Sequence, residues 1–447
     1  MSRIRIIITI IVVVLTTLLT GCTGKEPNEI AYVVALGIDS TDDDNYKITI
    51  QYANTTQISG GASESGGKAG SEIVDNVTIE APNIYAGVGL ANNIVSKSFS
   101  MSHAKLIVFS KEIAEKGVKD MIETLVRSEE IRPDVFIAVA NTTANDYLTS
   151  VNPEMEVNPA QYYQLIYQKN QLVGIPDGQL REFFTGLYTD NYDSILPVAG
   201  VIEGAGGNSQ NDDKGQSKDS QNEGSEGSSE SLDSFESKNS DENEKEKDAE
   251  KNTSKYEYDI KNYIGGETTI EKKNKAEAIG AAVFEKDKMV GELGEVETEI
   301  CKILKGDYTY SYLTYYNNDT PDIPITVKTT QQKKPKYKID TDKKTVDIEL
   351  YIESDLYSLP ADYNVENKIE DFERNVANYT SSTCTEFINN FTKKYNSDIL
   401  KLNEKVKYKF LTNNQYNWFK KNVGWSEYKF SVCTNFKVRR TGLIVRE

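Results

Sequence analysis

The sequence predicts an α+β protein with mixed and antiparallel sheets, packed helices, two to three subdomains and a disordered acidic linker. Three observations support this class. Short apolar runs with strand periodicity recur in both halves of the chain, and helical periodicity appears between them. Residues 203–254 contain almost no apolar side chains. A chain of 447 residues is also long for one domain, so two or three are expected.

The amino terminus has the pattern of an export signal. Arg3 and Arg5 precede an apolar stretch from Ile6 to Leu19, which only threonines interrupt. A membrane-spanning helix needs about 20 apolar residues, whereas the apolar part of a secretory signal needs roughly 7–15. The length therefore favours a signal peptide over residues 1–21.

The end of this segment, Leu19-Thr20-Gly21-Cys22, resembles the lipobox of bacterial lipoproteins. The resemblance implies cleavage between Gly21 and Cys22 and a diacylglycerol group on the Cys22 thiol, with acyl chains such as palmitate. No other cofactor is expected. Two acyl chains suffice for stable anchoring. The alternatives are an uncleaved anchor helix, or plain secretion in which Cys22 is incidental.

The first half of the mature chain, residues 22–155, is predicted to be an α+β domain. Strands are expected in a hairpin at 29–53 and then at 72–80, 103–109 and 134–140. Helices are expected at 82–97, at 111–127 with a break at Gly117, and at 143–149. Residues 156–202 continue as a second, mainly helical subdomain, with a helix at 158–190 and a strand at 194–202.

Residues 203–254 are predicted to be a disordered linker. The segment 203–252 has 15 acidic and 6 basic side chains, so it contributes 6 − 15 = −9 to the net charge of −18. Such a segment buries too little apolar surface to offset the entropy lost on ordering. A solvated linker is therefore preferred over an acidic tail that binds a partner.

The last part, residues 255–447, is predicted to be an antiparallel sheet with a long helix against it. The expected strands are a hairpin at 279–293, then 308–315, 323–330, 345–352 and 430–438. The expected helices are 295–305 and a long one at 365–395, whose apolar positions recur at steps of three and four.

Composition argues against several classes of function. The negative charge and the lack of a basic, aromatic-rich face disfavour nucleic-acid binding. The chain has one histidine, His103, and no serine lies in a nucleophile-elbow motif, so neither a catalytic triad nor a zinc site is expected and the protein is predicted not to be an enzyme. Three cysteines remain after Cys22, namely Cys301, Cys384 and Cys433. They could form one disulfide, with three possible pairings, but three buried thiols are preferred.

The order of motifs resembles the Ger(x)C family, the C subunits of bacterial spore germinant receptors. Four stretches carry the likeness. They are EIA and LGID at 29–39; SHAKLIV, IAEKG, LVR, Glu130 and Arg132 within 102–132; AAVF and KMVGEL within 281–293; and the long helix with the closing strand. The stretch at 102–132 is the most specific, and it places His103, Lys105 and Arg127 at family-motif positions whose role stays open. The acidic linker is an insertion relative to the family.

The resemblance implies a lipoprotein on the outer face of the spore inner membrane, without catalytic activity. It implies two integral membrane subunits as partners in a receptor for small nutrients, which this subunit contacts either directly or only through those partners. A solute-binding lipoprotein of a transporter is the alternative function, although that class usually has two lobes with long βα repeats. A surface-anchored hydrolase is disfavoured by the single histidine.

Overall fold

The computed structural model describes residues 3–10, 29–43, 45–53, 74–153, 156, 158–168, 174–189, 191–202, 262–268, 274–317, 320–358, 368–395 and 397–441. Residues 3–10 are helical. The predicted cleavage and lipid site at Gly21 and Cys22 lies outside the described residues, and so does the predicted linker at 203–254. The chain divides into two units, residues 1–205 with 260–447 and residues 206–259, and all described residues belong to the first.

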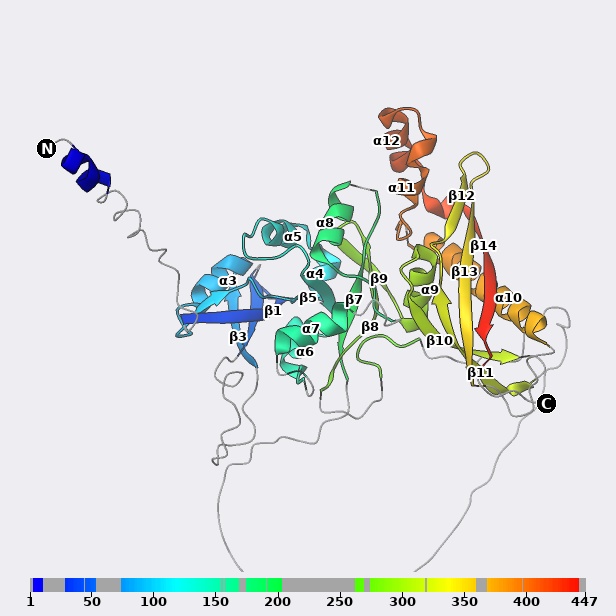
Figure 1. Ribbon diagram of the computed structural model, residues 1–447, viewed down its shortest axis with the longest axis horizontal. Coiled ribbons are helices and arrows are strands. Elements are labelled where there is room, and N and C mark those ends of the chain that lie inside the picture. Colours follow the sequence, from blue (N-terminus) through cyan, green and yellow to red (C-terminus); the bar gives the residue numbers. More distant parts are fainter. Residues whose placement is uncertain are drawn as a thin grey trace, which may run out of the picture. The chain divides into compact units, whose positions relative to one another are not determined.

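A nine-stranded mixed sheet organises the first half of the chain (Figure 1). Its order is β3 (Val74–Ala81), β2 (Tyr46–Ala53), β1 (Ile30–Ser40), β5 (Leu106–Ser110), β6 (Phe136–Ala140), β7 (Ile195–Val201), β8 (Ala276–Glu285) and β9 (Lys288–Leu293), with β4 (Ser98–Ser100) beside β1. Strands β1, β5, β6 and β7 run parallel, whereas both ends of the sheet are antiparallel. The central strands β5 and β6 are wholly buried, as expected of parallel strands covered on both faces.

Helices cover the two faces of this sheet, and alternate strand residues point to each side. Ile107 and Phe109 pack in one cluster with α3 (Ile84–Ala91), α4 (Lys111–Lys116), α5 (Lys119–Val126) and α8 (Leu180–Thr189). Leu106 and Val108 pack in the opposite cluster with α6 (Ala144–Ser150) and α7 (Pro159–Gln168). Two buried tyrosine hydroxyls in the second cluster, those of Tyr147 and Tyr167, hydrogen-bond to each other at 2.9 Å.

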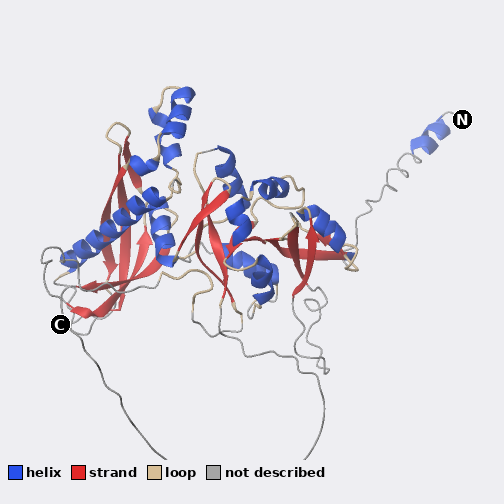
Figure 2. Ribbon diagram, turned by 180° about the vertical axis from the view of Figure 1, so that it is seen from behind, coloured by secondary structure: helices blue, strands red, loops and turns tan. Residues whose placement is uncertain are grey.

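A five-stranded sheet with a long helix forms the last part (Figure 2). Its strands follow the order β10 (Tyr310–Asn317), β11 (Thr320–Gln331), β13 (Thr345–Ser358) and β12 (Lys336–Asp340), and β14 (Lys429–Arg440) also pairs with β13. The helices of this part are α9 (Glu295–Lys305), α10 (Ile369–Lys394), α11 (Leu402–Val406), η2 (Lys407–Lys409), α12 (Asn413–Asn422) and η3 (Trp425–Glu427). Helix α10 buries Phe372, Val376 and Ile388 in the core of this part.

Polar side chains of α10 hydrogen-bond the backbone of β14. The side-chain amide of Asn389 bonds to both backbone groups of Phe430, as a residue of a neighbouring strand would. Its Oδ1 accepts from Phe430 N–H at 3.1 Å, and its Nδ2 donates to Phe430 O at 3.0 Å. Further along, Thr385 Oγ1 accepts from Val432 N–H at 3.0 Å and Ser381 Oγ accepts from Thr434 N–H at 2.9 Å. An edge strand left unpaired invites association with another chain, and here α10 satisfies its donors.

The structure confirms the α+β class and corrects three expectations about its parts. The hairpin β8–β9 belongs to the nine-stranded sheet through β7, and not to the C-terminal sheet. Strand β14 runs parallel to β13, so the C-terminal sheet is mixed rather than antiparallel. The segment 156–202 is not a separate helical subdomain, because α7 and α8 pack on the first sheet and β7 lies within it.

The predicted helix at 158–190 is also interrupted, for a reason visible in the backbone. Residues 174–179 are extended alongside the sheet: Gly178 O accepts from Ile137 N–H at 2.7 Å, and Gly174 O accepts from Gly280 N–H at 2.7 Å. Pro176 has no N–H to offer a helix at this place. The segment therefore bonds to strands instead of closing helical turns.

Candidate functional site

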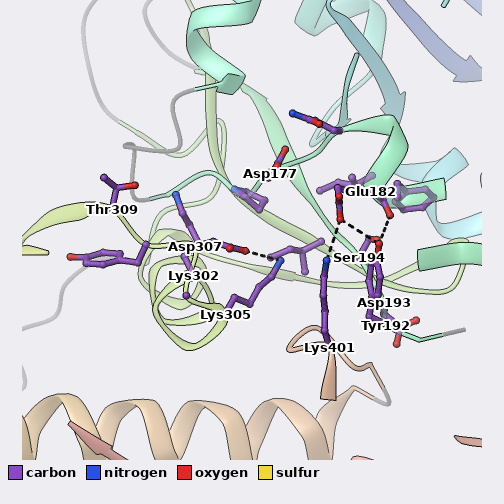
Figure 3. Close-up of a pocket in the computed structure, with 17 residues that line it drawn as sticks. Asp177, Glu182, Tyr192, Asp193, Ser194, Lys302, Lys305, Asp307, Thr309 and Lys401 are labelled. Atoms are coloured by element: carbon purple, nitrogen blue, oxygen red, sulfur yellow. Dashed lines mark hydrogen bonds and ion pairs between the residues drawn. The ribbon is translucent and has the colours of Figure 1, made fainter. Parts of the chain in front are cut away.

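A polar pocket of about 430 Å³ lies where β7, the carboxyl end of α9 and the segment before α11 meet (Figure 3). Charged side chains of both signs line it: Asp177, Glu182, Asp193, Asp307, Lys302, Lys305 and Lys401. Phe183, Tyr192 and Tyr308 supply most of its apolar and aromatic wall. Pockets that combine an apolar wall with a few fixed polar groups are the usual places for small ligands, so this is the candidate site.

One wall of the pocket is an ion pair supported by a tyrosine. Lys401 Nζ lies 3.2 Å from Glu182 Oε2 and 4.1 Å from the centre of the Tyr192 ring. The Tyr192 hydroxyl donates to the backbone oxygen of Glu182 at 3.0 Å. Burial would raise the pKa of Glu182, but the hydrogen bond and charge of Lys401 outweigh it and lower that pKa. Because the pair is half-exposed, it contributes less than about 1 kcal/mol to folding.

The opposite wall comes from the last turn of α9. Lys302 is buried, its Nζ donates to Ile175 O at 3.1 Å, and burial lowers its pKa to about 8. Lys305 lies 3.5 Å from Asp307. The helix stops at Gly306, whose φ of 82° is left-handed and whose N–H bonds back to Lys302 O at 3.0 Å. Both lysines therefore sit at the negative end of the helix dipole, which favours their charge.

Asp193 lines the pocket and connects its own segment, just before β7, to the β8–β9 turn and to the segment before α11. Its Oδ1 accepts from Lys286 N–H at 2.9 Å, in the turn between β8 and β9, and its Oδ2 accepts from Asp398 N–H at 2.8 Å. Asp398 in turn accepts from Leu402 and Asn403 N–H, each at 2.8 Å, and so caps α11. Burial raises the pKa of Asp193, and it raises the pKa of Asp398 to about 7.

The pocket thus joins residues of the first sheet to residues of α9, of the loop after it and of the segment before α11, and its charges are arranged as pairs and caps. Such an arrangement holds segments together and presents both carboxylate and ammonium groups to a small polar ligand. Within the described residues, no group of three or more His, Cys, Asp or Glu side chains is placed to hold a metal ion.

Two family models match the chain in the order in which the two sheets occur. Residues 24–201 match "Spore germination protein N-terminal domain", and residues 279–442 match "Spore germination B3/ GerAC like, C-terminal". The chain belongs to the Ger(x)C family of spore germination proteins. The gap between the two matches contains the acidic segment predicted to be an insertion.

Individual relatives of this Ger(x)C protein match over part of their length. "Spore germination protein KC" of Bacillus subtilis (strain 168) is 26% identical over 176 residues, which are 36% of this chain and 43% of that protein. "Putative spore germination protein YfkR" of the same organism is 28% identical over 145 residues, 32% of this chain and 37% of that protein. The matched regions therefore span less than half of these relatives. The "Crystal Structure of the GerBC protein" is 15% identical and covers 90% of this chain and 96% of that chain with a TM-score of 0.48.

The family-motif residues named from the sequence lie outside the pocket. His103 is exposed, its Nδ1 lies 3.0 Å from Ser102 Oγ, and its ring meets Tyr32 edge-on at 4.9 Å. Lys105 uses its backbone to join strands, donating to Val34 O at 2.9 Å and accepting from Phe136 N–H at 3.0 Å. These contacts place the two residues at the start of the central strand β5.

Arg127 and Glu130 also have local roles. Arg127 is exposed and lies 3.2 Å from Glu123, one helical turn earlier. Glu130 Oε2 accepts from Met101 N–H at 2.6 Å, which fastens the loop after α5 to the loop before β5. The residues in the densest part of the family pattern therefore stabilise the start of β5 and connect two loops. They do not form one cluster with the residues of the pocket.

Sequence reasoning missed Asp193, Asp398 and Lys302. A signal was present for the lysine, because Lys302 stands between Cys301 and Ile303 on an otherwise apolar stretch of α9, and buried charge in such a place marks a polar site. Asp193 and Asp398 carried no comparable signal, since each stands in a short polar loop and only the fold brings them together.

The cysteines differ from one another in exposure. Cys301, Cys384 and Cys433 are all free, but Cys433 is exposed on β14, which corrects the expectation of three buried thiols. An outward position of the strand suffices to expose it, because buried and exposed residues alternate along β14.

Among the residues that the structure describes, no helix has both the length and the apolar character needed to span a bilayer.

Proposed function

We propose that this Ger(x)C protein acts in spore germination as a lipid-anchored, non-catalytic subunit of a nutrient receptor. In this proposal, it is held on the outer face of the spore inner membrane and assembles there with two integral membrane subunits. The observation that carries the proposal is the match of both family models, in order, over residues 24–201 and 279–442.

The lipobox-like end at Leu19 to Cys22 supports the anchor. Two acyl chains on one thiol give stable attachment to a bilayer. Tethering confines the chain to a thin layer beside its partners and raises its effective concentration there without any new contact. A weak protein–protein interface is then sufficient for assembly.

The charged side chains of the pocket are engaged in contacts within the chain. Lys401 is paired with Glu182, Asp193 accepts from two backbone groups and Asp398 caps a helix. These contacts stabilise the junction between the nine-stranded sheet and the segment before α11. The sole histidine of the sequence, His103, contacts a neighbouring serine and a tyrosine ring.

The proposal is tested in spores that lack this protein. We expect the wild-type gene to restore the loss of optical density on nutrient addition, and Cys22→Ser to restore it poorly because the chain no longer stays at the membrane. Immunoblots of soluble and membrane fractions check that the Cys22→Ser chain is present and has left the membrane. Normal germination with an unanchored chain would contradict the proposal.

A further inference from the structure

A helical projection near the carboxyl end presents large apolar side chains to solvent. We call residues 402–422, which comprise α11, η2 and α12, the finger (Figure 1). Leu411 is 95% exposed, Tyr408 79% and Trp418 63%, and Leu411 is the most exposed large hydrophobic side chain in the described part of the protein. Single exposed apolar residues are ordinary, but a group of them marks an interaction site.

The three side chains share one surface. A hollow of about 570 Å³ is lined by residues that include Leu411 and Trp418, and a second of about 460 Å³ by residues that include Leu411 and Tyr408. Phe410 lines both. Leu411 thus borders both hollows, one of which it shares with Trp418 and the other with Tyr408.

The base of the finger is firmly packed, so its exposed residues are held outward. Phe419 packs between Phe410 at 5.0 Å and Trp425 at 5.8 Å, measured between ring centres. Trp425 Nε1 donates to Asn403 Oδ1 at 3.1 Å, and the Tyr416 hydroxyl donates to Asn403 O at 3.1 Å. Helix α12 turns Tyr416 and Phe419 inward and leaves Trp418 outside.

The charge of this segment is opposite to that of the whole chain. Residues 402–422 contain five lysines and one glutamate, or 5 − 1 = +4, whereas the chain carries −18. Lys407 and Lys421 are exposed near the apolar group, whereas the Lys409 ammonium donates to the backbone oxygen of Ile339 in β12. The positive charge of the finger therefore favours an anionic partner.

Aromatic, leucine and lysine side chains together are the composition of segments that lie in a membrane interface, where rings sit at headgroup level and lysines meet anionic lipid. A stable protein interface needs roughly 20–30 residues a side, many more than the exposed group supplies. We propose that the finger docks on an anionic membrane surface, with Leu411 and Trp418 entering the interface and Lys407 and Lys421 facing lipid phosphates. This second membrane contact goes beyond the lipid anchor of the proposed function, because the anchor only brings the chain near a bilayer.

The two tryptophans of the chain give a direct test. Trp418 is exposed and Trp425 is buried, so Trp425→Phe leaves a reporter at the finger and Trp418→Phe leaves one in its base. The full-length protein is titrated with vesicles of phosphatidylglycerol and phosphatidylcholine, or of phosphatidylcholine alone, containing a lipid-borne quencher. We expect the Trp418 emission to move to shorter wavelength and to be quenched at least twofold with anionic vesicles only. The Trp425 emission should stay unchanged.

Two variants separate the finger from the rest of the surface. Leu411→Ser should raise the lipid concentration for half-maximal quenching about tenfold, as expected from the loss of one apolar side chain from the interface. Ile94→Ser is the matched control, because Ile94 is a large aliphatic residue that is 68% exposed elsewhere in the chain. It should leave the titration unchanged.

Failure of the finger and failure of the anchor give different results. Without the anchor, every variant stops floating with vesicles at low lipid concentration, yet the anionic-specific change at Trp418 persists at high lipid concentration. The proposal is overturned if Trp418 shows no anionic-specific change at any lipid concentration. It is equally overturned if Trp418 becomes shielded only when a partner protein is added, since the finger would then dock on protein.

Discussion

The Asp193 carboxylate accepts a hydrogen bond from the backbone N–H of Asp398 at 2.8 Å, across 205 residues of sequence. The backbone N–H of Asp193 donates in return to Asp398 O at 3.1 Å. Through Lys286 N–H and the cap of α11, the same two residues connect the nine-stranded sheet to the base of the finger. The stability of this junction therefore depends on two carboxyl groups, the buried one of Asp398 and the half-buried one of Asp193.

The first prediction concerns the pH dependence of stability at Asp398. Burial raises the pKa of this carboxyl from 3.8 to about 7 in the folded protein. The folded chain then binds more protons than the unfolded chain between about pH 4 and pH 7, so the free energy of unfolding falls as pH rises through that window. The slope that this one group contributes is at most about 1.4 kcal/mol per pH unit.

Urea unfolding of the wild type and of Asp398→Asn at pH 4.5, 6 and 7.5 measures this contribution. The variant does not titrate at this position, so its curve should fall less steeply with pH than that of the wild type. Parallel curves for the two proteins would show that Asp398 keeps an ordinary pKa and that the junction is not buried as described.

The second prediction concerns the link between α10 and β14. Asn389→Ala leaves the Phe430 N–H and O without their side-chain partner. Each buried backbone group without a hydrogen-bond partner lowers the free energy of unfolding by about 1–3 kcal/mol. We expect a loss of stability of this order in urea unfolding. The neighbouring Asn390 is exposed on the same helix, so Asn390→Ala should be neutral or slightly stabilising. Equal effects of both substitutions would contradict the assigned role of Asn389.

The third prediction concerns a close backbone approach in β7. A Cβ at Gly200 would overlap the backbone of Gly265, whereas a Cβ at Gly89 in α3 would meet nothing within 4 Å. Overpacking typically costs about 1–3 kcal/mol, and a helical Gly→Ala change gains about 0.5–1 kcal/mol. Thermal unfolding should therefore show a lower midpoint for Gly200→Ala and an unchanged or higher one for Gly89→Ala. A neutral Gly200→Ala would mean that segment 262–268 does not lie against β7.

The fourth prediction concerns thiol reactivity. Cys433 is exposed, while burial raises the pKa of Cys301 and of Cys384 to about 12 in each case. The thiolate is the reactive form, so alkylation at pH 8 should modify Cys433 at least a hundredfold faster than the other two. Mass spectrometry of the labelled peptides identifies each site. Rapid labelling of Cys384 in the folded protein would contradict its place on the buried face of α10.

Local patterns predicted individual elements well where both ends were marked. The helix at Glu295–Lys305 has the bounds expected from its sequence, because Gly294 precedes it and Gly306 follows it. The alternation of Val346, Ile348, Leu350 and Ile352 likewise predicted β13. The apolar stripe predicted for α10 consists of Ile369, Phe372, Val376, Tyr379, Phe387 and Phe391. It is partly wrong, since Tyr379 is 44% exposed while Cys384 and Ile388 are buried.

Associations between distant segments could not be predicted in the same way. Strand β8 is buried along nearly its whole length, and nothing in the residues of the β8–β9 hairpin tells which sheet it joins. The parallel pairing of β14 follows from the crossover through α10, α11 and α12, and α12 itself has a polar sequence that was not recognised as a helix. The junction of Asp193 and Asp398 depends on both of these outcomes.

The proposed anchor is tested most directly by the mass of the amino-terminal peptide of the protein isolated from spore membranes. The account predicts a peptide that begins at Cys22 and carries the added mass of a thioether-linked diacylglycerol. A peptide with an unmodified Cys22 thiol, or one that still contains residues 1–21, would contradict it.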